Sequence, residues 1–576
     1  MRKNFQEGIL LMVNSKRLSY TFTGLLVLIG LVLIWRAFYG VNYNDEMYYA
    51  DCLYRLYQGD VYLVHDWQIH IMSFIPVYPF YALFHLITGS NEGVILYLRI
   101  LYTIFQLGVA TVCFLRLRHL GWGSLFVSLV YLLFTPFNIA AMSYNTMGLG
   151  FAMLVFSLLT GPKHHPRRDF ILCGICLAFC ILSTPFALIL YILYGAVCII
   201  QSLLCKYKKY QGWDEFSLSA FMWITAGAFL IFLIFGILLL QRASLSELSQ
   251  TFLYNFRMPG YEQNPSQWVE KLSGYFDRVY SSYPYLIWWT GLASLISVFD
   301  KKRTAHALWY LLPSTGLVLY YLYTYSTQYH VPTNFCIMPL AFLGFLCFFL
   351  LPRKNWKYFW LWFVPGMLYS LCSHFASDTG ILCITSSFVL CSSIGSLFLF
   401  ECGQEIIRNS GVRWMGKAAA GCIFAALTVH LCVTGYLRIT FFYNEAPLSE
   451  LTAQVKVGPA KGLYTTSSMA AFHSDRVEGL QSLALTEKDT LLVMGMEPWA
   501  YLCTDASCAA YSCWDSYDEY LYKVYLDIFP EKYPSIVYST NFEQDLAEKP
   551  FLQELLDQGY EIVDLNTATA LVNPDR

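Results

Sequence analysis

Apolar runs long enough to cross a lipid bilayer recur along most of this chain, and they constrain its fold more than any other feature. A helix needs about 20 consecutive apolar residues to span the hydrocarbon core. The composition agrees, because 57% of the 576 residues are hydrophobic and only 13% are charged, whereas a soluble protein carries about 25% charged residues. Backbone polar groups in lipid must be satisfied within the segment. The sequence therefore predicts a polytopic α-helical membrane protein.

Clusters of basic residues set the direction of each span, since cytoplasmic loops carry an excess of Lys and Arg. Arg2 to Arg17 place the N-terminus in the cytoplasm, and the first apolar run lacks the small-residue cleavage site of a signal peptide. One outward and one inward span fit between consecutive clusters, which gives about thirteen spans and an extracytoplasmic C-terminus. The predicted spans are 20–40, 91–115, 122–138, 148–159, 170–186, 188–204, 221–240, 285–299, 305–325, 332–351, 359–371, 381–400 and 418–442. This is the pattern of a multi-pass protein of the plasma membrane, and no basic stretch indicates nucleic acid as a partner.

One apolar segment, 69–88, does not fit this alternation. Counting it as a full span would reverse the side of every later loop. Pro76 and Pro79 also disfavour an uninterrupted helix. We therefore predict an interfacial or re-entrant helix in the first outer loop; the alternative is an ordinary span with another pairing missed.

The composition divides the chain into two domains. Residues 1–443 form the predicted transmembrane domain, with two long outer loops at about 41–91 and 241–284. From 444 to 576 the charge rises, and helical patterns such as 543–558 separate short β-like runs. Such alternation predicts a small extracytoplasmic α/β domain with a partly parallel sheet. The β-like runs are 462–466, 490–494, 535–539 and 561–565.

An acidic pair, Asp45 and Glu46, follows the first span directly. Asn44 is a candidate N-cap, both acids fall in the first turn, and Gly59 ends the pattern. Apolar residues within 47–57 recur at helical spacing, which predicts an amphipathic helix lying against the outer leaflet. The acids could simply complement the helix dipole. An acid beside the membrane is also a candidate functional group, and the helix N-terminus favours its ionised form, which suits a base.

This arrangement resembles the first outer loop of the GT-C membrane glycosyltransferases, which include the protein O-mannosyltransferases, the lipid A aminoarabinose transferases and the single-chain oligosaccharyltransferases. The matching motifs cover roughly the first 150 residues, and beyond them the likeness is one of architecture. The features that carry it are the acidic pair, the helix ending at Gly59, Tyr62, the segment with Pro76 and Pro79, Gly89, and Leu98-Arg99-Ile100.

The resemblance implies a bacterial enzyme, an inverting glycosyltransferase of the hexosyltransferase type. It implies a polyprenyl-phosphate-linked sugar donor and a glycan, lipid or protein acceptor on the outer face. Because the lipid phosphate leaves readily, one carboxylate suffices, and Asp45 is implied as the general base that takes the acceptor's proton. Glu46 is implied as its supporting partner or as an oxygen facing a metal ion.

Asn145 lies in an outer turn where many relatives carry a second acid. An amide can orient a sugar hydroxyl but supplies no charge to a metal ion, so a divalent metal cofactor stays open. The alternative is a plain turn or helix cap. His65 and Asp66 close the first long loop and are candidates for binding phosphate or orienting the base, the alternative being a solvated pair.

An anionic donor needs cationic or hydrogen-bonding groups on the outer side. Arg257 lies in the second long loop, where this superfamily engages lipid phosphate. Tyr329, His330 and His374 lie on short outer turns. These four residues complete the predicted substrate-binding set, although an interfacial histidine can equally be a structural hydrogen-bonding group.

Three cysteines, Cys503, Cys508 and Cys513, lie close together in the predicted outer domain. They lack the paired spacing of a zinc site, and outside the cytoplasm two of them could form a disulfide. Two other functions remain open from the sequence: a flippase or transporter of a lipid-linked saccharide, and a polymerase or ligase of surface polysaccharide. A transporter is expected to show internal repeats, which this sequence lacks.

Overall fold

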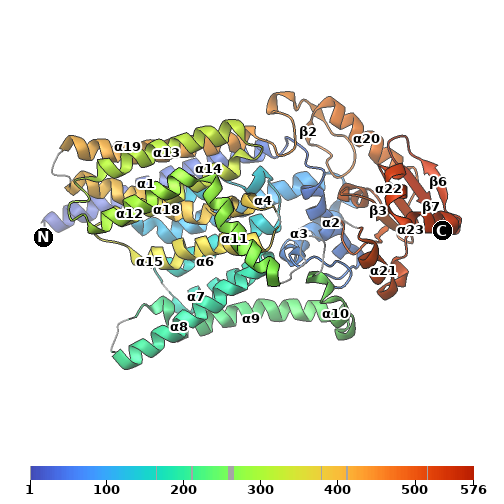
Figure 1. Cartoon of the computed structure of the whole chain (residues 1–576), viewed down its shortest axis with the longest axis horizontal. Helices are drawn as coiled ribbons and strands as arrows, with labels where there is room; N and C mark the ends of the chain where they lie inside the picture. The colour runs from blue at the N-terminus through green and yellow to red at the C-terminus, as the bar shows by residue number, and fades with distance from the viewer. Residues whose placement is uncertain are drawn as a thin grey trace.

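The computed structural model describes residues 2–163, 165–208, 212–256, 265–377, 379–409, 413–514 and 517–576, with side chains from residue 16 onward except at 208, 256 and 265–267. A bundle of long helices occupies one half of the molecule, and a smaller domain containing a β-sheet occupies the other (Figure 1). The N-terminus lies at the far end of the bundle from this domain. The fold is that of a multi-pass helical membrane protein with an α/β domain at one end.

Each of the thirteen predicted spans coincides with a helix or with consecutive helices of the bundle. Seven helices of the described part are long and apolar enough to cross a membrane, and three shorter apolar helices accompany them; the number of crossings stays a prediction. The bundle helices are α1 (Arg2–Arg36), α4 (Val94–Leu117), α5 (Gly123–Leu132), α6 (Tyr144–Thr160), α7 (Pro166–Ser183), α8 (Leu188–Lys208), α9 (Leu218–Leu240), α12 (Pro284–Phe299), α13 (Ala307–Gln328), α14 (Pro332–Leu350), α15 (Trp356–Tyr358) with a π-helical turn (Phe359–Phe363) and α16 (Val364–Phe375), α17 (Ile381–Ser387) with α18 (Val389–Asn409), and α19 (Arg413–Thr440).

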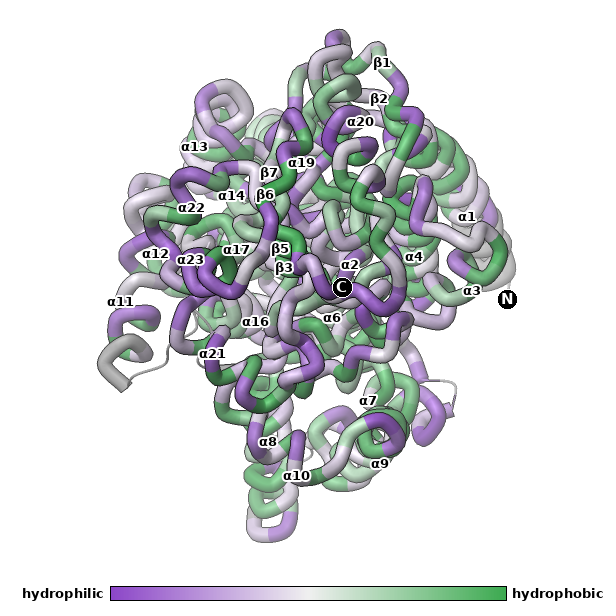
Figure 2. The backbone as a smooth tube through the Cα atoms, turned by 90° about the vertical axis from the view of Figure 1, so that its right-hand side faces the viewer, coloured by the Kyte–Doolittle hydropathy of each residue, from purple (hydrophilic) through white to green (hydrophobic). Residues whose placement is uncertain are grey.

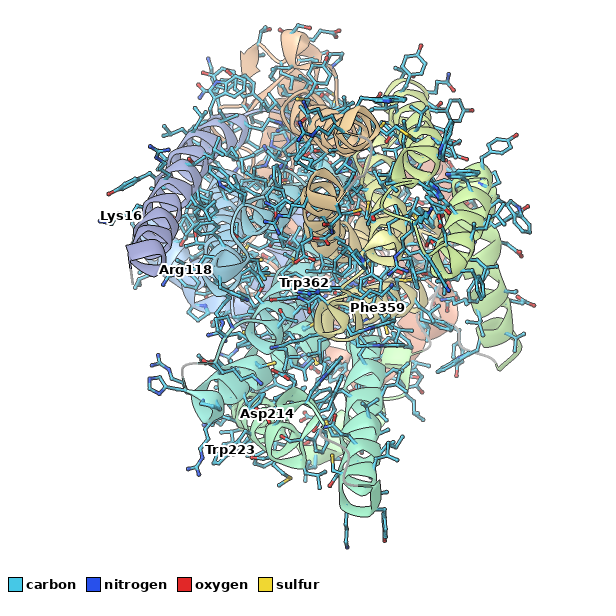
Figure 3. The ribbon with its side chains drawn as sticks, turned by 90° about the vertical axis from the view of Figure 1, so that its left-hand side faces the viewer. Lys16, Arg118, Asp214, Trp223, Phe359 and Trp362 are labelled. Carbon is cyan, nitrogen blue, oxygen red and sulfur yellow. The ribbon has the colours of Figure 1, made fainter. Side chains whose placement is uncertain are left out.

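Loops that the charge pattern assigns to the cytoplasm meet at one end of the bundle. Glu215 accepts ion pairs from Lys163 at 3.1 Å and Lys357 at 2.9 Å, which joins three of these loops. Arg116 pairs with Asp169 at 3.1 Å and links two more segments. Figure 3 looks at the bundle from the end that carries the N-terminus, where Lys16, Arg118 and Asp214 are labelled. The alternation of sides is thus consistent, while the orientation in the membrane stays a prediction.

The apolar segment 69–88 does not cross the bundle. It forms a short 3₁₀ turn (Ile71–Phe74) and α3 (Tyr78–Thr88). An 11-residue helix is about 17 Å long, well short of the roughly 30 Å of hydrocarbon that a span must cover. α3 lies beside α2 (Asp45–Gln58) between the bundle and the α/β domain (Figure 1), and its Leu86 and Ile87 are exposed. The structure therefore supports an interfacial helix.

The C-terminal domain contains a five-stranded sheet of order β4-β3-β5-β7-β6, in which β3 runs parallel to β4 and β5, and β7 antiparallel to β5 and β6. The partly parallel sheet is confirmed. The run 462–466 instead forms β2, which pairs with β1 in a separate ribbon, and Pro550 breaks the run 543–558 into two helices. The elements are β1 (Ala453–Gln454), β2 (Tyr464–Thr465), α20 (Ser467–Gln481), β3 (Thr490–Val493), a 3₁₀ helix (Pro498–Cys503), β4 (Ser507–Cys508), α21 (Glu519–Ile528), β5 (Ile536–Ser539), α22 (Phe542–Glu548), α23 (Pro550–Asp557), β6 (Glu561–Asp564) and β7 (Thr569–Val572). Figure 2 views this end, with the apolar strands β3 and β5 among more polar surface segments.

The first outer loop and the C-terminal domain share one hydrophobic core, separate from the main core of the bundle. Trp67 of the loop stacks on Tyr511 and meets the edge of Tyr525, both from the C-terminal domain. α2 is buried on every side from Glu46 to Arg55. The prediction that this helix lies against the outer leaflet is therefore wrong. The C-terminal domain, far away in sequence, covers the face that a local pattern assigns to lipid.

Candidate active site

The chain turns sharply between α1 and α2 so that the acidic pair lies at the domain end of the bundle. Gly40 has a positive φ of 76°, and its backbone N–H donates to the Tyr464 carbonyl at 2.8 Å. A side chain at this position would overlap the Phe442 ring at 2.4 Å. Only glycine fits this close approach without strain.

The cap of α2 differs from the sequence prediction. Asn44 occupies the N-cap position but makes no capping hydrogen bond with its side chain. Asn42 takes that role, because its Oδ1 accepts from the N–H groups of Asn44 at 3.2 Å and Glu46 at 3.4 Å. At the other end, Gly59 is left-handed with a φ of 111°, as predicted.

The two acids of the pair lie in different environments. Glu46 is buried, and Arg99 of α4 binds it through two hydrogen bonds, one at 2.7 Å from Nε. Arg99 also donates to the carbonyls of Ala37 and Tyr39 at 2.9 and 3.1 Å. Both oxygens of Glu46 are thus engaged in an ion pair that joins α1, α2 and α4. This position agrees with a supporting role for Glu46.

Asp45 remains partly accessible and has no cationic partner in an ion pair among the described residues. Its side chain accepts a long hydrogen bond, 3.5 Å, from the Asn42 amide. Burial raises its pKa to about 6, the Asn42 hydrogen bond lowers it, and the nearby Glu46 charge raises it. Burial therefore outweighs the helix N-terminus that the sequence emphasises. A carboxylate with a pKa of about 6 is mostly ionised at neutral pH and is a stronger base than an ordinary aspartate.

The start of α6 lies close to Asp45. Burial raises the pKa of Tyr49 of α2, and the charge of Asp45 raises it further. Asp45 also interacts electrostatically with Tyr144, the first residue of α6. Asn145 is partly accessible in the first turn of α6 and contacts Tyr144. Ser143, and not Asn145, caps this helix through a capping box with Thr146. The structure thus brings Asp45 and Asn145 into one neighbourhood.

Tyr443, just after α19, forms another side of this neighbourhood. Burial raises its pKa, and Asp45 adds to the shift. The His330 ring lies 6.0 Å from the Tyr443 ring, so the exposed His330 borders the same region. Tyr329 instead packs on Tyr325 and Phe335 at ring distances of 4.5 and 4.7 Å.

A small cavity next to Asn42 and Glu46 is bordered by the guanidinium groups of Arg36 and Arg99. Arg36 lies over the Phe442 ring and donates to the carbonyls of Tyr39 and Phe441. Arg438 of α19 interacts electrostatically with Arg36 and donates to Asn138 at 2.7 Å. Neither Arg36 nor Arg438 forms an ion pair with a described carboxylate, and their Nε atoms lack hydrogen-bond partners. Such a cluster of buried cations favours a bound anion.

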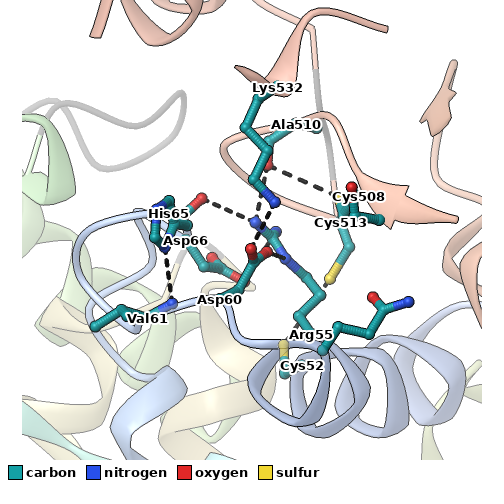
Figure 4. Close-up of polar contacts among 12 residues, drawn as sticks. Cys52, Arg55, Asp60, Val61, His65, Asp66, Cys508, Ala510, Cys513 and Lys532 are labelled. Carbon is teal, nitrogen blue, oxygen red and sulfur yellow. Dashed lines mark hydrogen bonds and ion pairs between the residues drawn. The ribbon is translucent and has the colours of Figure 1, made fainter. Parts of the chain in front are cut away.

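His65 and Asp66 lie elsewhere, in a buried ion network between the end of α2 and the C-terminal domain (Figure 4). Arg55 is fully buried and binds Asp60 at 2.9 Å and Asp66 at 3.2 Å, and Lys532 binds Asp60 at 2.6 Å. Lys532 and Arg55 hold the pKa of Asp60 well below its usual range although burial opposes this, whereas burial raises the pKa of Asp66 to about 6. The solvated pair is therefore wrong for both residues.

His65 closes the same loop through its ring. Nδ1 accepts from the Val61 N–H at 2.9 Å, the ring packs on Phe529, and burial lowers its pKa. Arg55 lies about 15 Å from Asp45 along α2, at about 1.5 Å per residue. The geometry therefore gives His65 and Asp66 contacts that hold the C-terminal domain, at a distance from the acidic pair.

Two other predicted residues remain, His374 and Arg257, of which the structure describes only His374. His374 bonds through Nε2 to the Lys271 carbonyl at 3.1 Å and so ties α16 to α11 (Pro265–Ser282). Arg257 lies outside the described residues. The described start of its loop, α10 (Leu245–Thr251), packs on the first outer loop, where Thr251 donates to the Leu63 carbonyl at 2.8 Å.

Sequence reasoning missed Arg36, Arg438 and Tyr443. A signal for the two arginines was present, because a charged residue at the outer end of an apolar helix is rare and calls for a functional or structural partner. Their proximity could not be predicted, since Arg36 and Arg438 belong to the first and last bundle helices.

A scan of known protein families finds no match to this chain, and no curated protein sequence matches it. Among solved structures, ArnT from Cupriavidus metallidurans bound to undecaprenyl phosphate is similar over 96% of this chain and 98% of its own, with 11% identity and a TM-score of 0.40. Its apo form gives a TM-score of 0.39. The archaeal oligosaccharyltransferase AglB from Archaeoglobus fulgidus, in complex with an inhibitory peptide and a dolichol-phosphate, covers 96% of this chain and 74% of its own, with 11% identity and a TM-score of 0.35.

Proposed function

We propose that this protein is a membrane glycosyltransferase that moves a sugar from a polyprenyl-phosphate-linked donor to an acceptor hydroxyl, with inversion and with Asp45 as the general base. The observation that carries the proposal is the division within the acidic pair. Arg99 neutralises Glu46, whereas Asp45 stays accessible, has no cationic partner among the described residues, and has a pKa of about 6. A base for neutral pH needs these properties.

The reaction follows from these positions. The Asp45 carboxylate takes the proton of the acceptor hydroxyl as its oxygen forms a bond to the anomeric carbon. The bond from that carbon to the lipid phosphate breaks, and the phosphate leaves with the electron pair. No proton donor is required, because a phosphate is a good leaving group. A single displacement of this kind inverts the anomeric configuration. Asn145 is suited to hold a sugar hydroxyl, and Glu46 with Arg99 keeps the first turn of α2 in place.

The buried cations support an anionic donor. Arg36 and Arg99 border the cavity beside Asn42, Arg438 adds a third guanidinium nearby, and the Nε atoms of Arg36 and Arg438 lack partners among the described residues. A phosphate accepts hydrogen bonds from guanidinium groups in a charge-assisted geometry. We therefore assign the lipid phosphate to the neighbourhood of these three arginines.

An apolar cavity of about 500 Å³ between α6, α7, α8 and α16 offers a place for the isoprenoid chain. Its lining is almost entirely apolar, with residues such as Phe156, Leu177, Leu190 and Leu368. Burying a hydrocarbon chain there is favourable for the same reason that lipid tails avoid water.

The acceptor reaches the base by a different route, through a cavity in the C-terminal domain. A cavity of about 300 Å³ opens where β3 and β5 end, and Tyr43 and Asn44 border it from the first outer loop. The crevice at the carboxyl ends of parallel strands is the usual ligand position in α/β sheets. Asn44 directly precedes Asp45, so an acceptor bound here lies next to the base.

Reconstitution of the full chain in proteoliposomes tests the proposal. We expect Asp45→Asn to lower sugar transfer from a panel of undecaprenyl-phosphate-linked sugars by about 10²- to 10⁴-fold, the usual contribution of a general base. The variant should retain binding of undecaprenyl phosphate, measured by native mass spectrometry. Glu92→Gln is the matched control, because Glu92 is an exposed acid at the end of the same loop. If Asp45→Asn transfers sugar at the wild-type rate, Asp45 is not the base. If the wild-type protein transfers sugar from none of the donors, the proposed function is wrong.

A further inference from the structure

A second cluster of reactive groups lies at the other end of the first outer loop, where the C-terminal domain covers α2. Cys52 of α2 and Cys513 of the C-terminal domain are both buried, and their sulfur atoms are 3.9 Å apart. A carboxylate oxygen of Asp66 lies with them, so that the three ligand atoms are all within 4.8 Å of one another. Among the described residues this is the one group of three His, Cys, Asp or Glu side chains that could share a metal ion.

Unpaired carboxylate oxygens point to a ligand at this cluster. Asp51, which precedes Cys52 in α2, is fully buried, and its carboxylate forms no ion pair among the described residues. Its carboxylate lies beside the Cys513 thiol. Asp66 is also fully buried, and its Oδ1 lacks a partner within the described part of the chain. Buried carboxylates without partners are costly and call for an explanation such as a bound ion.

The geometry of the sulfur atoms fits a tetrahedral ion. Zinc binds each thiolate at about 2.3 Å, so two cysteine ligands of one ion lie about 3.8 Å apart. The distance of 3.9 Å here agrees with that value. Arg55 donates to the other oxygen of Asp66 at 3.2 Å, which leaves Oδ1 free and fixes the plane of the carboxylate (Figure 4). Metal-binding carboxylates are commonly oriented by such outer hydrogen bonds.

We propose that Cys52, Cys513 and Asp66 bind a divalent metal ion of the zinc type that fastens the C-terminal domain to α2. Binding replaces the two thiol protons, which pass to solvent, by two thiolate–metal bonds. The site joins residues that are 461 positions apart in sequence. The three donors are all buried and join α2 to the C-terminal domain, which favours a structural role for the ion.

Metal content of the purified full chain, expressed without a histidine tag, tests this site. We expect about one zinc ion per chain by plasma mass spectrometry. That zinc should be lost in Cys52→Ser and in Cys513→Ser and kept in Cys503→Ser, a cysteine of the same domain outside the cluster. Zinc that persists in both cysteine variants would overturn the proposal, because the ion would then be bound elsewhere.

X-ray absorption at the zinc edge tests the wild-type protein directly, so the proposal stays falsifiable even where a variant does not fold. The expected first shell has two sulfur atoms at about 2.3 Å and at least one oxygen atom at about 2.0–2.2 Å. Peptide mapping under non-reducing conditions follows the thiols in the same sample. Zinc-free wild-type protein with a Cys52–Cys513 disulfide, or with both thiols open to alkylation after unfolding, would overturn the metal site.

Discussion

Helix α2 presents acids at both ends, and their surroundings differ. At its start, Arg99 pairs with Glu46 while Asp45 stays accessible without a cation. At its end, Arg55 and Lys532 pair with Asp60 and Asp66 inside the contact with the C-terminal domain. Buried, paired charges give an interface its geometry. Asp45 is both partly accessible and unpaired, whereas the unpaired Asp51 of the same helix is fully buried, and this difference separates Asp45 from its neighbours.

Arg55→Met has the largest expected effect, and it acts at the end of α2, where the C-terminal domain makes contact. Arg55 also donates to the carbonyls of His65 at 2.8 Å and Ala510 at 2.9 Å. Its loss therefore leaves Asp66 without an ion-pair partner, leaves Asp60 with Lys532 alone, and removes a donor from both carbonyls. We expect the free energy of unfolding to fall by about 3–5 kcal/mol, as when one partner of a buried ion pair is removed. Thermal unfolding in detergent measures this change. Arg242→Met is the control, since Arg242 is exposed and makes one bond to the Leu56 carbonyl; an equal loss in both variants would contradict the distinction.

The pH dependence of sugar transfer tests the start of α2, where Asp45 lies. Asp45 is active as a base only when it is ionised, and burial raises its pKa to about 6. Transfer should therefore be nearly constant above pH 7 and fall about tenfold between pH 7 and pH 5. The measurement is the single-turnover rate in proteoliposomes. A profile that is flat down to about pH 4.5 would indicate an ordinary, solvated aspartate.

Gly59→Ala tests the point where α2 ends and the ion network with the C-terminal domain begins. Gly59 ends α2 in the left-handed conformation, and no atom lies within 4 Å of the position a side chain would take. The cost is then one of backbone conformation alone, about 1 kcal/mol in the free energy of unfolding. Gly24→Ala in α1 is the comparison, because Gly24 is a helical glycine with equally open surroundings and should gain stability. Unchanged stability of Gly59→Ala would place the end of α2 elsewhere.

Lys461→Ala gives the smallest expected effect. Lys461 pairs with Glu92 at 2.6 Å between the C-terminal domain and the end of the first outer loop, but the side chains are 50% and 40% exposed. Exposed pairs contribute about 0–1 kcal/mol. Lys532→Ala, at the buried pair with Asp60, should cost clearly more. Equal costs in thermal unfolding would show that burial does not distinguish the two contacts.

The linear pattern predicted the helical spans, the interfacial segment 69–88 and the α/β domain, because hydrophobic runs, prolines and loop charges act locally. It also identified the acidic pair, since acids beside an apolar span stand out in any sequence. It could not separate Asp45 from Glu46 by environment, because Arg99 lies on another helix. It assigned α2 to the lipid surface, because the domain that covers this helix begins several hundred residues later.

The sequence by itself therefore indicated a multi-pass helical bundle, a small C-terminal α/β domain and the location of the acidic pair. Only the tertiary structure decided which acid stays unpaired and that Arg36 lies near both Arg99 and Arg438. It also showed that Cys513 lies next to Cys52 of α2. The physical reason is that spans and caps depend on residues a few positions apart. Ion pairs, shared cores and metal ligands instead depend on contacts between segments that folding alone brings together.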